Sequence, residues 1–178
     1  MRFIGIDLGT TFIKGAVLCL DDWGIRQVER LPFPEPITGL RASFREFDPA
    51  QIVTTARALL ERLLRYAPDA EGIVCCSQLH GRVFTTEEGR AVSILISWQD
   101  QRALESAPSG GGTYFDEVNR RITPEERREL GNEPRPGAPL VSFIGLPRTA
   151  GCRHSLHWRR TCRALWWPIC AVVLPPST

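Results

Sequence analysis

The stretch GIDLGTTFIKGAVL, residues 5 to 18, contains two short apolar runs separated by a few small polar residues. The first run ends just after an acid, Asp7, and the second carries Lys14, the only lysine of the chain. Apolar runs of this length around Gly-Thr-Thr predict two antiparallel strands joined by a tight hairpin.

The predicted turn is rich in groups that suit a phosphate. Its backbone amides and hydroxyls would point into one small space, which favours an anion. Gly9 lets the backbone approach closely, Thr10 and Thr11 offer donors, and Asp7 is a hard oxygen ligand for Mg2+. Lys14 could neutralise phosphate charge. An ordinary hairpin, in which Asp and Thr satisfy the turn amides, explains the same residues equally well.

Composition limits the class of protein. With 178 residues, 43% of them hydrophobic, the chain can form one domain with a sizeable core. A net charge of +2 and the lack of a basic, aromatic stripe argue against nucleic acid as a partner. No secretory signal is evident and the apolar run 164–174 is too short to span a membrane, so we expect a cytoplasmic protein. The six cysteines lack metal-like spacing and are expected to be reduced core thiols.

The pattern beyond the first hairpin predicts a mixed sheet with helices. Residues 24–33 extend the two strands to a three-stranded antiparallel meander. Residues 47–69 form the clearest helix, with Asp48 as cap, Pro49 in the first turn and Gln51 completing a capping box. The apolar, short segment 71–77 predicts a buried strand.

The second half of the chain has weaker signals. Residues 78–82 are expected to be a loop and 83–97 a hairpin that turns at 87–89, followed by 98–105 leading into a helix. The run 108–112, PSGGG, is a flexible connection. Residues 122–132 predict a helix with Thr123 as cap, Glu126 as capping partner and Gly131 as stop.

The composition changes near residue 149. The last acid is Glu133, and residues 150–178 contain four arginines, three cysteines and three tryptophans. Codons rich in G and C, read out of frame, give such residues in excess. Our hypothesis divides the chain into a partial domain, 1–148, and a frameshifted or otherwise non-native end, 149–178; a genuine basic tail is the alternative.

Four segments in order resemble known proteins. GIDLGTTFIKGAVL is similar to the first phosphate motif of the actin-like ATPase superfamily. Residues 75–84 (CCSQLHGRVF), 96–103 (ISWQDQRA) and 130–143 (LGNEPRPGAPLVSF) resemble the FGGY carbohydrate kinases, most closely the xylulokinase and sedoheptulokinase branch. The resemblance implies an α/β, ribonuclease H-like (actin-like ATPase) N-terminal domain, here incomplete.

The resemblance also implies roles for individual residues. Positions that would hold Mg-ATP, with Asp7 at the metal, are Asp7, Gly9, Thr10, Thr11 and Lys14. Positions that would meet a sugar or polyol are Gln78, His80, Gly81, Trp98, Asp100 and Arg102. Phe12 departs from the family, which usually has a small hydroxyl residue there. Taken singly, His80 could be an ordinary loop histidine, Trp98 plain core, and Asp100 with Arg102 a surface ion pair.

The implied reaction is transfer of the ATP γ-phosphoryl group to a sugar hydroxyl. In the family, the aspartate that takes the proton of that hydroxyl lies beyond the segments matched here, so no catalytic base is assigned. We therefore expect no turnover from this chain alone. The alternative is a non-catalytic sugar- or nucleotide-binding fragment or interaction module, which could self-associate through an uncovered sheet edge.

Overall fold

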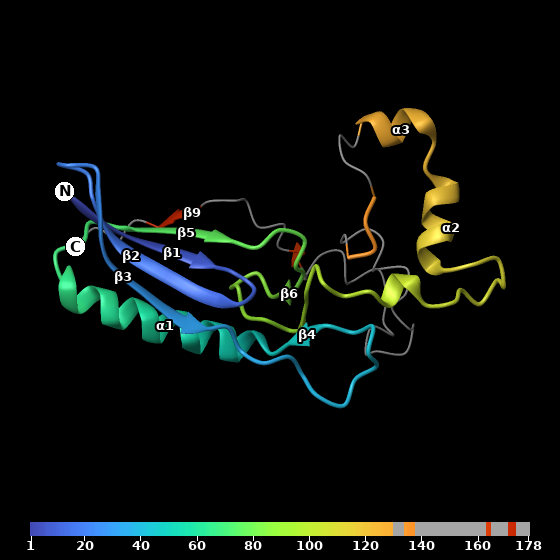
Figure 1. Ribbon diagram of the computed structural model, residues 1–178, viewed down its shortest axis with the longest axis horizontal. Coiled ribbons are helices and arrows are strands. Elements are labelled where there is room, and N and C mark those ends of the chain that lie inside the picture. Colours follow the sequence, from blue (N-terminus) through green and yellow to red (C-terminus); the bar gives the residue numbers. More distant parts are fainter. Residues whose placement is uncertain (130–133, 138–162, 165–170, 174–178) are drawn as a thin grey trace. The chain divides into compact units, whose positions relative to one another are not determined.

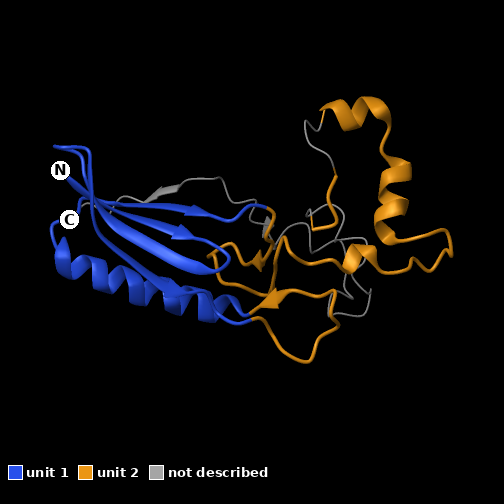
Figure 2. Ribbon diagram, in the orientation of Figure 1, with its two compact units in different colours: residues 1–35, 48–79, 166–178 blue, residues 36–47, 80–165 orange. Residues whose placement is uncertain are grey.

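The structure, a computed structural model, describes residues 1–129, 134–137, 163–164 and 171–173. It divides into two compact units (Figure 2). Unit 1 comprises residues 1–35, 48–79 and 166–178, and unit 2 comprises 36–47 and 80–165. The boundary expected at residue 148 lies outside the described residues, as does most of segment 130–143, and the division at 148 stays a prediction.

A mixed sheet forms the centre of unit 1 (Figure 1). The predicted meander is confirmed, since β1 pairs antiparallel with β2 and β2 with β3. The predicted buried strand is β5, which lies parallel to β1. The sheet has the order β3-β2-β1-β5-β9, and its strands are β1 (Arg2–Leu8), β2 (Phe12–Cys19), β3 (Gly24–Pro32), β5 (Ile73–Ser77) and β9 (Ala171–Val173).

The outer edge of β5 pairs with residues near the end of the chain. β9 runs antiparallel to β5, with Ile73 opposite Val173 and Cys75 opposite Ala171. The expected uncovered sheet edge is therefore not found at these three positions of β5. Self-association stays a prediction that this pairing does not test.

The predicted helix is α1 (Pro49–Tyr66), and it packs on one face of the sheet (Figure 1). The Asp48 carboxylate caps it by accepting the amide of Ala50 at 2.8 Å, in place of the capping box expected with Gln51. Leu59 and Leu63 of the helix are fully buried. On the sheet side the core is formed by alternate residues of the two central strands, which are Ile4, Ile6, Ile13, Val17 and Cys19.

Unit 2 is held by short strand pairs. Strand β4 (Glu46–Phe47) pairs with β7 (Leu95–Ile96), and β6 (Phe84–Thr85) pairs with β8 (Arg163–Ala164). The predicted turn at 87–89 is present, with Gly89 at φ 82°. The two arms of the expected hairpin 83–97 are bridged at Thr85 with Ala91 and, just before residue 83, at Arg82 with Ile96, and β7 pairs with β4 in addition.

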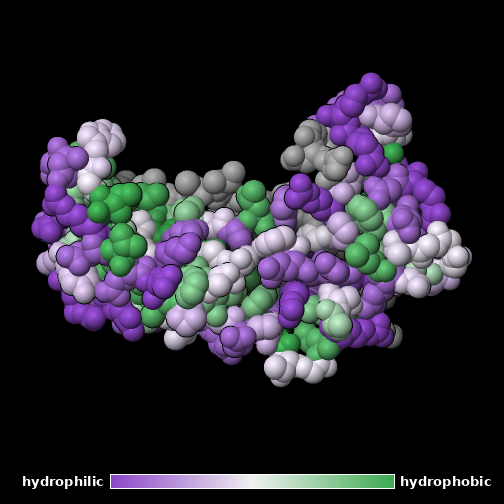
Figure 3. Space-filling view, in the orientation of Figure 1, coloured by the Kyte–Doolittle hydropathy of each residue, from purple (hydrophilic) through white to green (hydrophobic). Residues whose placement is uncertain are grey.

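The helices of unit 2 are short and largely hydrophilic (Figure 3). Residues 98–105, expected to lead into a helix, contain a single 3-10 turn, η1 (Arg102–Leu104). The sequence reasoning missed α2 (Tyr114–Arg121), whose Thr113 and Asp116 form a capping box. The capping of α3 (Pro124–Glu129) is confirmed, since Thr123 and Glu126 bond each other's backbone amides. Its expected stop, Gly131, lies outside the described residues. None of the described helices is long and apolar enough to cross a membrane.

Replacing Gly15 by alanine should destabilise unit 1, because the sheet and α1 leave no room there. A Cβ at position 15 would lie 2.6 Å from Leu63 Cδ1 and 2.9 Å from the Gly5 carbonyl oxygen. We expect Gly15→Ala to lower the free energy of unfolding by about 1–3 kcal/mol, measured by urea denaturation. Gly5→Ala is the matched control, since its Cβ would meet only the flexible end of Leu18 at 3.3 Å. Equal losses in the two variants would contradict this packing.

Candidate functional site

The hairpin turn of residues 9–11 is tightly packed and hydrogen-bonded to the neighbouring strand. Strand pairing ends at Leu8 opposite Ile13. A Cβ at Gly9 would lie 2.9 Å from the Phe12 carbonyl oxygen, so a larger residue would force the turn open. The Phe33 amide donates to the Thr11 carbonyl at 3.0 Å and ties the turn to the end of β3. The turn is therefore fixed at both ends.

Charged side chains line up beside this turn on the sheet face opposite α1. The register places Asp7 opposite Lys14, and Lys14 opposite Arg30. Asp7 is half-buried, and the Cys76 thiol donates to its Oδ1 at 3.5 Å. Lys14 and Arg30 are exposed, and the Arg30 guanidinium lies 4.8 Å from the centre of the Phe12 ring. One carboxylate and two cations thus border the turn.

Arg30 is a residue that the sequence reasoning missed. It lies in the third strand, and only the β2–β3 register brings it beside Lys14. Its guanidinium lies over Phe12, the position that departs from the family by lacking a hydroxyl. Counting residues back from the turn between β2 and β3 does not predict this pair. The irregularity between Gly15 and Val17 shifts the register of the two strands before Lys14 is reached.

In unit 2, Asp100 is fully buried and its two carboxylate oxygens accept four hydrogen bonds. The Arg45 amide donates to Oδ2 at 2.8 Å, and the Arg102 amide donates to Oδ1 at 3.1 Å. The Arg102 guanidinium donates two further hydrogen bonds, from Nε to Oδ1 at 2.7 Å and from Nη2 to Oδ2 at 2.8 Å. It also binds Glu46 of β4. The alternative of a surface ion pair is therefore wrong.

Four charged side chains form a buried charge cluster, which we define as Glu46, Arg82, Asp100 and Arg102. Burial opposes ionisation of Asp100, but hydrogen bonds from Arg102 and the Arg45 amide outweigh it and hold the pKa of Asp100 below its usual value. Burial likewise opposes the charge of Arg102, yet its bonds to Asp100 and Glu46 raise its pKa. Burial lowers the pKa of Arg82 to about 10. With two charges of each sign, the cluster is neutral.

A cavity of about 510 Å³ opens next to Asp100, within unit 2. It brings together three of the predicted residues, His80, Trp98 and Asp100. Trp98 is 45% exposed, so the reading of Trp98 as plain core is wrong. The other lining residues, which the sequence reasoning missed, are Arg45, Gln99, Gln101, Arg135, Pro136 and Gly137.

The backbone at this cavity carries strain. His80 has φ 65°, a left-handed conformation that L residues other than glycine adopt at a cost, and that occurs often at functional sites. Gly137 packs against Trp98 so closely that a Cβ there would lie 1.7 Å from the Trp98 carbonyl oxygen. The close contact with Trp98 therefore requires glycine at position 137.

The remaining predicted residues lie elsewhere. Arg102 sits behind Asp100 and does not line the cavity. Gly81 is half-buried, with the Leu95 side chain 3.5 Å from where its Cβ would be. Gln78 belongs to unit 1, where its amide donates to the Leu8 carbonyl at 3.1 Å. Among the described residues, its buried side-chain oxygen accepts no hydrogen bond.

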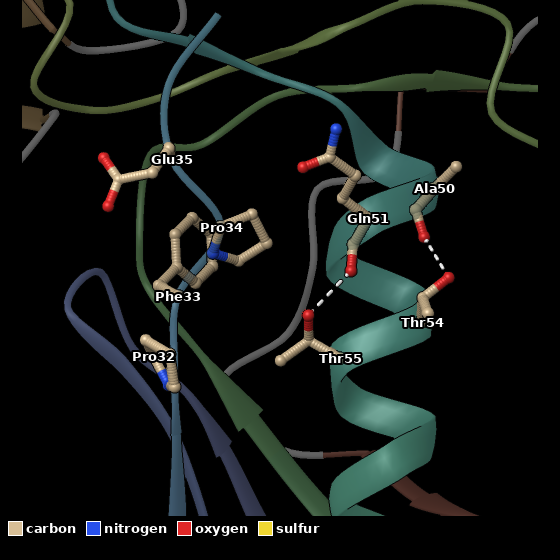
Figure 4. A pocket seen from close by; sticks show the side chains of 8 residues that line it. All are labelled: Pro32, Phe33, Pro34, Glu35, Ala50, Gln51, Thr54 and Thr55. Atoms are coloured by element: carbon tan, nitrogen blue, oxygen red, sulfur yellow. Dashed lines mark hydrogen bonds between the residues drawn. The ribbon is translucent and has the colours of Figure 1, made fainter.

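A further cavity of about 510 Å³ lies in unit 1, between the end of β3 and the start of α1 (Figure 4). The hydroxyls of Thr54 and Thr55 are used within the helix, where they donate to the carbonyls of Ala50 and Gln51. The opposite wall is largely apolar, with Phe33 between two prolines. This cavity holds none of the predicted site residues.

Removing the charge of Asp100 should cost stability, because it leaves Arg102 buried with fewer partners. We expect Asp100→Asn to lower the free energy of unfolding by about 3 kcal/mol near neutral pH. Because the folded-state pKa of Asp100 is lowered, its contribution is present above about pH 4 and is lost as the pH falls further.

The measurement is urea denaturation of both proteins between pH 7 and pH 2.5. The gap between wild type and Asp100→Asn should close at the acid end. Asp116→Asn is the control, since Asp116 also has a lowered pKa but is exposed, at a helix N-terminus. A gap that stays constant with pH would show that the carboxylate charge is not what stabilises the cluster.

No protein-family model and no curated protein matches the chain. Solved structures do match it. A xylulose kinase from Lactobacillus acidophilus has a TM-score of 0.66 at 22% identity over 83% of this chain and 28% of its own. A gluconate kinase from the same organism gives 0.65 and 21% over 84% of this chain and 29% of its own. A "xyloylose kinase" from Brucella ovis gives 0.65 and 23% over 81% and 29%.

The chain thus spans less than a third of the length of each of these kinases. At such identities the likeness concerns the fold. It agrees with the observed antiparallel meander, the parallel strand β5 and the helix α1 on one face. The chain has the fold of the N-terminal domain of actin-like ATPase sugar kinases.

Proposed function

We propose that this chain is the part of an ATP-dependent carbohydrate kinase that holds the phosphates of Mg-ATP and a sugar or polyol. The observation that carries the proposal is the cavity beside Asp100, where His80 and Trp98 meet around a space large enough for a small sugar. Xylulose and gluconate are the substrates in the names of the similar structures, and they suggest the class of ligand.

The turn of unit 1 would hold the phosphates. The amides and hydroxyls of Thr10 and Thr11 would donate to phosphate oxygens, while Lys14 and Arg30 would neutralise their charge. The described residues contain no group of three or more metal ligands. One carboxylate, Asp7, nevertheless fits Mg2+, which usually keeps several waters and binds proteins through one or two carboxylates and substrate phosphates. When bound, Mg2+ would neutralise charge on the phosphate oxygens.

The cavity of unit 2 would hold the sugar. Trp98 offers an aromatic face for the C–H side of the sugar ring or chain, and His80, Gln99 and Gln101 offer donors and acceptors for hydroxyls. Asp100 is a positioning residue here, since both of its oxygens are engaged by the protein. It holds the segment that carries Trp98 and the glutamines.

We propose binding without turnover for this chain by itself, in the cytoplasm and with no nucleic acid or membrane as partner. The resemblance places the aspartate base outside the matched segments, so no described residue is assigned to take the proton of the sugar hydroxyl. Release of ADP, followed in a coupled assay with a panel of ketoses and polyols, tests this. Sugar-dependent turnover by the purified chain would contradict it, whereas binding alone is the expected result.

Lys14→Gln should weaken binding of an ATP analogue about tenfold, because one charge-assisted contact to phosphate is lost. Isotope-labelled protein, titrated with the analogue and Mg2+, reports both the affinity and the amides that move. Arg57→Gln is the control, since it removes an exposed positive charge from α1, on the other face of the sheet. Unmoved amide signals at residues 7–14 would contradict the phosphate site.

His80→Asn should weaken sugar binding about tenfold while leaving thermal unfolding nearly unchanged. Asparagine tolerates the left-handed conformation that residue 80 adopts, but it cannot replace the imidazole. His80→Val is the contrasting variant, because a β-branched residue at φ 65° should cost about 1–3 kcal/mol of stability. If His80→Asn binds the sugar with wild-type affinity, His80 does not contribute to sugar binding.

A further inference from the structure

We propose that Phe12 is a positioning residue that holds the Arg30 guanidinium beside the hairpin turn of residues 9–11, and that Arg30 makes this site prefer a nucleoside triphosphate over a diphosphate. The inference rests on the proposed function and deepens it, because it names the residues that distinguish phosphate chains of different length. It follows from where the two side chains lie on the sheet.

Phe12 and Arg30 lie on the same face of the sheet. Ile13 of β2 is fully buried on the face that α1 covers, so its neighbours Phe12 and Lys14 lie on the opposite face. Arg30 of β3 pairs with Lys14 and therefore shares that face. Because Lys14 and Arg30 are exposed, a ligand can reach both cations from solvent.

The Arg30 guanidinium is displaced toward the turn. The strand register sets Arg30 beside Lys14, but the guanidinium lies over the ring of Phe12, 4.8 Å from its centre. Phe12 is two residues nearer to the turn than Lys14, which corresponds to about 7 Å along a strand. It is also the first residue of β2, directly after the turn. The guanidinium is therefore held at the end of the strand that borders the turn.

The charge of Arg30 has no ion-pair partner among the described residues. Its neighbour Lys14 has the same charge, and like charges directly opposite each other on a sheet are destabilising. Asp7 lies opposite Lys14 on the side away from Arg30. A contact between a cation and a ring at an exposed site contributes about 0.5–1 kcal/mol. Two adjacent cations therefore favour an anionic ligand over a role in stability.

A second cation at the turn favours the ligand with more negative charge. Each further phosphate adds charge, and the attraction to a fixed cation grows with it. A guanidinium also presents paired donors that match two phosphate oxygens. This contact would replace the one that the resemblance implies for a hydroxyl at position 12, where this chain has Phe12.

The first test is the affinity of the full chain for three phosphate compounds, measured by calorimetry in the presence of Mg2+. The compounds are a non-hydrolysable ATP analogue, ADP and tripolyphosphate, and the last one isolates the phosphates from the nucleoside. Arg30→Gln should weaken binding of the ATP analogue and of tripolyphosphate about five- to tenfold, and binding of ADP about twofold. Arg26→Gln is the matched control, since Arg26 is an exposed arginine of the same strand that pairs with Val17, away from the turn.

The second test asks whether Phe12 acts through Arg30. Phe12→Leu keeps an apolar side chain but removes the ring, and it should weaken binding of the ATP analogue about threefold. Phe12→Tyr keeps the aromatic face and should bind like the wild type. In the Arg30→Gln background, Phe12→Leu should cause no further loss. Amide spectra of each variant report whether it is folded, and Arg30→Gln alters only an exposed side chain.

The outcomes are distinct. An unchanged affinity ratio between the ATP analogue and ADP in Arg30→Gln, or a loss in Phe12→Leu that persists without Arg30, would overturn this inference. Tripolyphosphate binding that does not depend on Arg30 would overturn it too, because Arg30 would then contact the nucleoside. If Lys14→Gln still weakens binding in these cases, the proposed phosphate site stands. If none of the three compounds binds to the folded wild-type chain, the phosphate site fails, and this inference fails with it.

Discussion

The buried Asp100 carboxylate is the constraint on which the site in unit 2 depends. Removing a carboxylate from water costs several kcal/mol, and here two backbone amides and one guanidinium compensate for that loss. The same bonds join two distant parts of the chain, because the Arg45 amide binds Asp100 and Arg102 also binds Glu46, the first residue of β4. A cluster of this kind stabilises little compared with an apolar core, but it fixes the geometry of the segment that carries Trp98.

Close backbone contacts serve the same purpose in both units. Gly9 keeps the turn after β1 tight, Gly15 lets α1 lie directly on the sheet, and Gly137 lies against Trp98. At each of these positions a side chain would meet a backbone oxygen. Glycine at these positions therefore allows neighbouring backbone segments to pack in direct contact. This packing fixes the backbone that carries the polar side chains of the two sites.

The two candidate sites differ in how they carry charge. The turn of unit 1 sets one acid beside two cations on an open sheet face, an arrangement that suits a metal-bound phosphate. The cavity of unit 2 sets two exposed arginines above a neutral cluster.

The sequence by itself determined the meander, the buried strand β5, α1 and its cap at Asp48, because these depend on local periodicity and capping. It also pointed to the residues of the turn and to His80 and Trp98 through their motifs. Only the tertiary structure decided that Asp100 and Arg102 are buried, that β7 pairs with β4, and that Arg30 and Arg45 join the sites. These features depend on strand register and burial, which bring together residues far apart in the chain. A local sequence pattern therefore cannot predict them.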